Sequence, residues 1–131
     1  MRHVRSSRLL AAAAAAMAVP AAVSAAGLLH LRLVRAEPRA SATVAAAPAA
    51  VRLWFSQAPE AAVTRIRLVG PAGAVALGTV TRDTSGAVGA LVRGRMSPGA
   101  YQVEWRTMSA DGHPVGGRYG FRVVAAASAA R

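Results

Sequence analysis

The sequence contains no cysteine. Without thiols the chain can form neither disulfides nor thiolate metal sites. A soft or borderline metal ion would therefore have to be bound by histidine, methionine, carboxylate or backbone groups. Histidine is itself scarce, at three residues, and methionine numbers four. These few side chains are the ones to examine for metal chemistry.

Acidic and aromatic residues are also few. Five acids face sixteen basic residues, all of them arginine, for a net charge of +11, and from His30 onward thirteen arginines leave a net +8. The arginines are scattered singly or in spaced pairs such as Arg65/Arg67 and Arg93/Arg95, and few aromatic rings are present to stack on bases. We therefore interpret them as a solvated surface and expect no nucleic-acid partner.

The N-terminus has the three parts of an export signal. A basic "MRHVRSSR" precedes the apolar "LLAAAAAAMAVPAAV", and "SAAG" offers the small residues of a cleavage site. We predict a signal peptide over residues 1–26, with its boundary between 25 and 29, and a protein that is periplasmic or secreted. Residues 9–29 are long enough to span a bilayer if uncleaved, so a membrane anchor is the alternative. The mature chain is predicted to be a β domain over residues 27–125 with a flexible tail at 126–131.

Beyond the signal the chain alternates strand patterns with turn residues. No convincing helix follows the signal, and the arrangement predicts an all-β domain of seven strands in a sandwich or small barrel. The strand patterns cover residues 30–36, 51–55, 63–70, 74–81, 86–94, 101–108 and 118–124.

The alternation also predicts which side chains face the core. In 63–70, Ile66 and Leu68 share one face and the arginines share the other. Tyr101, Val103 and Trp105 share a face in the same way. Trp105 and the other tryptophan, Trp54, both occupy strand positions expected to point inward, so we expect both in the core.

One loop pattern points to chemistry. In "SADGHPVGG", Asp111 and His113 are two residues apart, so an extended backbone projects both to one side, and Pro114 favours that backbone at His113. Gly112 lets the chain bend, and Gly116 and Gly117 are expected to let the loop turn into the last strand. Carboxylate and imidazole together suit a borderline divalent metal, with copper at the top of the affinity order. The alternative is an Asp-Gly turn with a solvated histidine.

Two long segments resemble the CopC family of exported copper-binding proteins. "YQVEWRTMSADGHPVGGRYGFRV" is similar to the family's closing segment, with a "G-x-Y-x-V-x-W" strand, a "S-x-D-G-H" loop and a final "G-x-F-x-F-x-V" strand. "HLRLVRAEPRASATVAAAPAAVRLWFSQAPE" is similar to the opening segment, with His30, Leu33, Pro38 and the strand Pro48 to Ser56 in its positions. Residues 60–95 match only as generic strands.

The resemblance implies a seven-stranded Greek-key barrel or sandwich, immunoglobulin-like or cupredoxin-like, with a Cu(II) site at one end. The family's ligands fall on His30, through its amine and imidazole, and on Asp111 and His113. The implied protein is a monomer that captures Cu(II) for copper resistance, homeostasis or delivery to a membrane copper transporter of the CopD type. It is not an enzyme. His3 lies in the predicted signal and plays no part.

The sequence departs from the family pattern at its start. Small residues favour cleavage after Ala25, Ala26 or Gly27, so His30 would offer its amine only after trimming. Cleavage after Gly27 would instead leave Leu28-Leu29-His30, whose terminal amine, amides and third-position histidine can wrap Cu(II).

Two further departures concern side chains around the site. Gln57 stands where the family often has Glu, and the mature chain has only Met96 and Met108, far short of a methionine-rich Cu(I) loop. We expect Met108 to be a core residue. The alternative functions are a copper-independent immunoglobulin-like interaction module and a copper-dependent oxidising enzyme.

Overall fold

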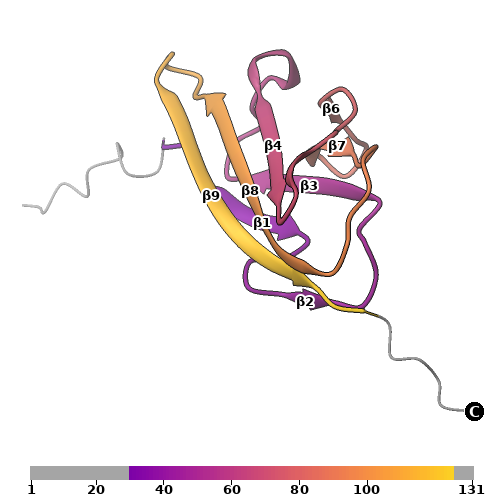
Figure 1. The fold of residues 1–131 in the computed structure, drawn as a ribbon. Coiled ribbons are helices and arrows are strands. Elements are labelled where there is room, and N and C mark those ends of the chain that lie inside the picture. The colour runs from indigo at the N-terminus through magenta and orange to yellow at the C-terminus, as the bar shows by residue number, and fades with distance from the viewer. Residues whose placement is uncertain (1–29, 126–131) are drawn as a thin grey trace, which may run out of the picture.

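Two β-sheets packed face to face form the domain (Figure 1). The computed structural model describes residues 30–125, so the predicted signal peptide and tail lie outside the described part of the chain. One sheet has the order β1, β3, β7, β6, and the other has the order β2, β9, β8, β4, β5. The strands of the first sheet are β1 (Leu33–Glu37), β3 (Ala50–Phe55), β7 (Val88–Leu91) and β6 (Thr81–Arg82). Those of the second are β2 (Thr43–Val44), β9 (Pro114–Val123), β8 (Gly99–Met108), β4 (Arg65–Gly70) and β5 (Gly73–Val75).

The prediction of an all-β sandwich is confirmed, with nine strands in the described residues where seven were expected. The predicted strand 74–81 accounts for part of the difference. Its beginning pairs with β4 as β5, and its end pairs with β7 as β6, so the run divides between the two sheets. β2 is the other addition, a two-residue strand parallel to β9. One local pattern cannot show which sheet each half will join.

The core lies between the sheets and is built from alternate residues of each strand. Ile66 and Leu68 face inward from β4 while Arg65 and Arg67 are exposed, as the alternation predicts. Tyr101, Val103 and Trp105 are likewise buried on β8. A single short 3-10 turn, η1 (Ala61–Val63), precedes β4, and no helix within residues 30–125 is long and apolar enough to cross a membrane.

The two tryptophans differ in position. Trp105 is 6% exposed and meets Phe55 edge to face, with ring centroids 4.9 Å apart, which confirms the prediction that it packs in the core. The prediction for Trp54 is wrong. Val51 and Leu53 are the buried residues of β3, so Trp54 points outward, where the guanidinium groups of Arg35 and Arg52 cover its ring at 4.4 and 4.7 Å.

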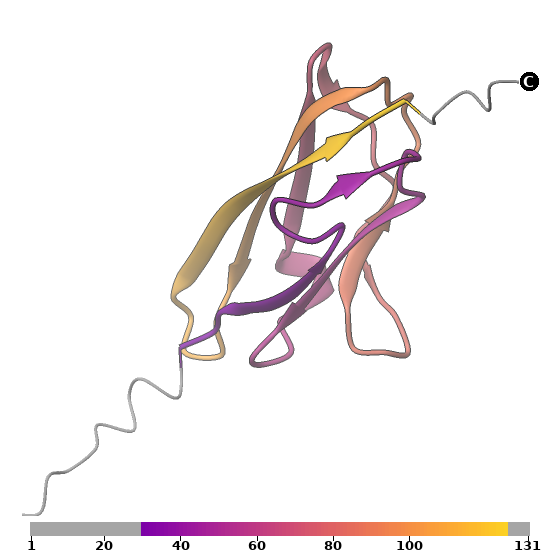
Figure 2. The same cartoon turned by 90° about the horizontal axis from the view of Figure 1, so that it is seen from below.

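β8 and β9 form the longest hairpin and position the loop that sequence analysis singled out. They pair from Gly99 opposite Val123 to Met108 opposite Pro114, which leaves residues 109–113 as the connection at the tip. Figure 2 shows that tip beside the beginning of the described chain at residue 30. Gly116 and Gly117 lie within β9 rather than in the loop, so the turning role expected of them is wrong.

Candidate metal centre

The loop at the tip of the β8–β9 hairpin is closed by its own backbone. The Ser109 amide donates to the His113 carbonyl at 2.9 Å, and the Gly112 amide donates to the Ser109 carbonyl at 2.9 Å. Gly112 has φ +84°, a left-handed conformation that costs glycine little and other residues more. The glycine therefore makes the tight turn between the two candidate ligands possible.

The structure brings Asp111 and His113 into direct contact. Oδ2 of Asp111 lies 2.8 Å from Nδ1 of His113, and the His113 amide donates to Oδ1 of Asp111 at 3.3 Å. The Ser109 hydroxyl also donates to Oδ1 of Asp111 and lies 3.1 Å from the His113 carbonyl. Both side chains of the pair remain exposed, at 60% for Asp111 and 79% for His113, so an ion can reach them from solvent.

The surroundings of Asp111 favour its anionic form. The hydrogen bond from the Ser109 hydroxyl, followed by those from the His113 ring and amide, holds the pKa of the Asp111 carboxyl well below its usual range. A carboxylate is the form that binds a cation. Ser109 was not among the residues predicted for the site, although serine and aspartate close together before a glycine are typical of a turn held by side-chain hydrogen bonds.

His30 lies at the start of the described chain and is held in place by a hydrogen bond to its backbone carbonyl. Its carbonyl is 3.3 Å from the Ser56 hydroxyl, which also accepts from the Arg32 amide at 3.1 Å. The next residue, Leu31, is buried in the core. The His30 side chain is exposed. These contacts hold the start of the chain against the end of β3.

The three candidate ligands are not gathered into one cluster. Within residues 30–125, no group of three histidine, cysteine, aspartate or glutamate side chains is close enough to hold a metal ion. The structure thus joins Asp111 to His113, and His30, at the same end of the sandwich, does not complete a three-residue group with them.

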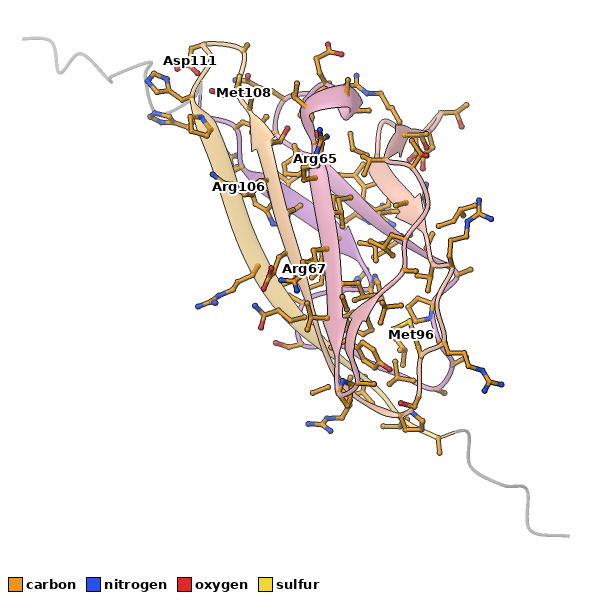
Figure 3. The ribbon with its side chains drawn as sticks, turned by 45° about the horizontal axis from the view of Figure 1, so that its top comes forward. Arg65, Arg67, Met96, Arg106, Met108 and Asp111 are labelled. Carbon is orange, nitrogen blue, oxygen red and sulfur yellow. The ribbon has the colours of Figure 1, made fainter. Side chains whose placement is uncertain are left out.

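The two methionines of the predicted mature chain lie in different environments. Met96 packs against the core, but Met108 is 44% exposed at the end of β8, so the prediction that Met108 is a core residue is wrong. At the end of the strand its alternation places it on the outer face of the sheet. Figure 3 shows Met108 close to Asp111 at this tip.

Comparison with known proteins agrees with this architecture. The CopC domain matches residues 33–124, a range that includes Asp111 and His113 and begins three residues after His30. Protein YobA of Escherichia coli K12 is 32% identical over 97 residues, covering 72% of this chain and 78% of YobA, and YobA of Shigella flexneri gives the same figures.

Two solved structures share the fold. CopC from Methylosinus trichosporium OB3b superposes with a TM-score of 0.64 at 32% identity, covering 72% of this chain and 93% of that one. PcoC, a methionine-rich copper resistance protein from Escherichia coli, superposes with a TM-score of 0.65 at 29% identity, covering 72% and 99%. The sandwich is accordingly cupredoxin-like, and the expectation of a copper-binding protein rather than an enzyme is confirmed. The chain belongs to the CopC family of copper resistance proteins.

Proposed function

We propose that this protein is exported through its N-terminal signal and captures Cu(II) at the tip of the β8–β9 hairpin, with Asp111 and His113 as ligands and His30 as the third. The observation that carries the proposal is the contact between Asp111 and His113 on an exposed loop of a CopC domain. Imidazole nitrogen and carboxylate oxygen are donors that Cu(II) accepts readily. CopC family proteins are periplasmic, which fits the predicted export.

The geometry favours Nε2 of His113 as its metal-binding atom. Nδ1 is already in contact with Asp111, whereas Nε2 has no hydrogen-bond partner among residues 30–125. Binding through Nε2 leaves the Asp111 contact intact, and a carboxylate on the far nitrogen orients a ligating imidazole and raises its basicity. For Asp111 to bind the ion directly as well, its contact with Nδ1 has to open. Its second oxygen, held by Ser109, would then keep the loop in shape.

His30 completes the site only if the chain is processed in its neighbourhood. A mature protein that begins at His30 offers an amine and an imidazole that chelate together, whereas a longer one offers the imidazole alone. The intact mass of the exported protein decides between these forms. It also tests the proposed signal over residues 1–26 and the alternative of an uncleaved anchor.

Copper titration followed by electron paramagnetic resonance tests the ligands. His113→Ala should weaken Cu(II) binding by more than about 100-fold, because loss of a ligand should exceed the 10–100-fold cost of losing an outer-shell partner. Asp111→Asn should weaken it less if the carboxylate only orients His113, and should change the spectrum if it binds directly. Asp83→Asn, in another turn, is the matched control. Unchanged affinity in His113→Ala would refute the site.

Delivery of the captured ion to a membrane copper transporter of the CopD type, by a monomeric protein, is the downstream step we propose. Sedimentation of the copper-loaded protein tests the monomer. Transfer of Cu(II) to the purified transporter, faster than from free copper at equal concentration, tests delivery. A loaded protein that protects cells from copper without the transporter would indicate storage instead.

A further inference from the structure

The outer face of the five-stranded sheet collects arginines that are far apart in the sequence. Arg65 and Arg67 come from β4, Arg106 from β8, and Arg118 and Arg122 from β9, and all five are exposed. Cross-strand pairing places Arg65 of β4 opposite Arg106 of β8. Glu104, on the central strand β8, lies opposite Arg67 on one side and Arg118 on the other. Residues opposite one another share a face of the sheet. We call these five arginines the basic face.

Charge on the basic face is barely neutralised. Glu104 is the one carboxylate on the described strands of this sheet, and it lies 3.6 Å from Arg67 with both side chains exposed. The outer face of the other sheet differs, because there Arg35 and Arg52 are matched by Glu37 and Asp83. The two faces of one small domain therefore carry different net charge.

The pairing of Arg65 with Arg106 lowers the stability of the isolated protein. Like charges directly opposite in an antiparallel sheet are destabilising. Arg65 donates to the carbonyls of Ala62 and Thr64, which hold its head in place without neutralising it. Arg106 has no ion pair among the described residues. An anion bound from outside the protein would reduce the repulsion between the two guanidinium groups, so the pair would then favour binding.

Apolar side chains continue the face towards the hairpin tip. Thr64 and Thr107 follow the arginine pair and share a buried hydroxyl contact of 2.8 Å. Beyond them lie Val63, in the turn η1 that precedes β4, and Met108, at the end of β8, exposed at 46% and 44%. Figure 3 shows the progression from Met108 at the tip to Arg106 and Arg65, with Arg67 further along the sheet. The surface is therefore basic over most of its length and apolar at the end beside the Asp111 loop.

We propose that the basic face docks on an anionic phospholipid bilayer, with the arginines on lipid phosphates and Val63 and Met108 in the interfacial region. Arginines spread over three adjacent strands match a planar array of phosphates better than they match one acidic side chain or a narrow groove. Arginine binds phosphate through paired N–H groups, and each cation near an anionic membrane adds measurably to binding. The proposal concerns surface charge and does not depend on copper binding.

Vesicle flotation of the exported protein tests the proposal. Binding is compared on phosphatidylcholine vesicles and on vesicles with about 30 mol% phosphatidylglycerol, across a salt series, since contacts between exposed charges weaken with salt. Arg65→Gln/Arg106→Gln should bind the anionic vesicles about 30-fold more weakly than the parent. The matched control Arg39→Gln/Arg93→Gln removes the same charge from outside the basic face, where Arg39 lies beside β1 and Arg93 beside Gly78. It should stay within about threefold of the parent.

The results of these experiments distinguish a membrane from an acidic protein as the partner of the basic face. Arg65→Gln/Arg106→Gln should have a melting temperature equal to or above that of the parent, because it loses a like-charge pair. The salt dependence of vesicle binding by the parent tests the proposal without any variant. Equal binding to neutral and anionic vesicles, or equal loss in both double variants, overturns the proposal. The proposal is also overturned if the parent binds poly-glutamate but not anionic vesicles, and if Arg65→Gln/Arg106→Gln loses the binding to poly-glutamate. That result would indicate that the basic face binds an acidic protein.

Discussion

Replacing Gly117 by alanine should destabilise the domain through a specific collision. Gly117 lies opposite Trp105 in the β8–β9 hairpin, and a Cβ at this position would stand 2.8 Å from Cζ2, 2.9 Å from Cε2 and 3.0 Å from Nε1 of the indole. Comfortable carbon contacts begin near 3.5 Å. Three overlaps on one rigid ring mean that the ring or the strand must move.

The ring has little room to move. Trp105 is buried and packs edge to face on Phe55, so displacing it disturbs the contact between the two sheets. Added volume in a packed core costs about 1–3 kcal/mol. For a domain of this size, 2 kcal/mol lowers the melting temperature by about 8–16 °C. Thermal unfolding by circular dichroism measures the shift, and tryptophan emission reports any change around the indole.

Gly120→Ala is the matched control, because it makes the same substitution in the same strand. Its Cβ would lie 3.4 Å from the Tyr101 carbonyl oxygen, an ordinary contact. The change should stay within about 0.5 kcal/mol or be slightly stabilising, since glycine weakens a strand. Trp105→Phe should partly rescue Gly117→Ala by removing the colliding atoms. If Gly117→Ala and Gly120→Ala melt within about 2 °C of each other, the packing described for Trp105 is wrong.

Two further predictions concern carboxylates in turns. Ser109→Ala should raise the pKa of Asp111 towards its usual value, because the hydroxyl is the strongest influence holding it down; a pH titration by nuclear magnetic resonance measures this, and an unchanged titration would contradict the role given to Ser109. Asp83 accepts from Ser85 and Arg52, which lowers its pKa from 3.8 to about 2 in the folded protein. The unfolded state therefore binds a proton first as pH falls, so the stability that this carboxylate contributes is present above about pH 4 and is lost towards pH 2. Asp83→Asn should lose that part of the acid dependence in chemical denaturation, and an unaltered profile would show that the Ser85 and Arg52 contacts do not form in solution.

The candidate site could be predicted in part. The spacing of two residues led us to expect Asp111 and His113 on one side, and the structure places them in contact. The backbone between them is the Asp-Gly turn given as the alternative, with Gly112 at φ +84°, and is not the extended segment on which the expectation rested. The role of Ser109 was not predicted, because its hydroxyl reaches Asp111 only in the closed loop. The place of His30 relative to the pair depends on how two distant parts of the chain meet at one end of the sandwich. No local pattern contains that information.

The sequence by itself determined which segments form strands and, where a strand alternates clearly, which of its side chains face the core. Period-two alternation in β4 and β8 was sufficient to assign Leu68, Val103 and Trp105 to the core, since a strand turns successive side chains to opposite sides. In β3 the same alternation puts Val51 and Leu53 on one face and Arg52 with Trp54 on the other, and the structure follows it. The expectation that Trp54 faces the core was wrong because it did not apply this alternation.

Tertiary structure alone decided which strands are neighbours. The sequence spreads its arginines so widely that they read as a solvated surface, yet the order of β9, β8 and β4 in one sheet gathers five of them on a single face. It also places Gly117 against Trp105 and joins the two halves of residues 74–81 to different sheets. The reason is physical: alternation is a property of one strand and its own backbone, whereas pairing and register depend on contacts between segments tens of residues apart, which no short stretch encodes.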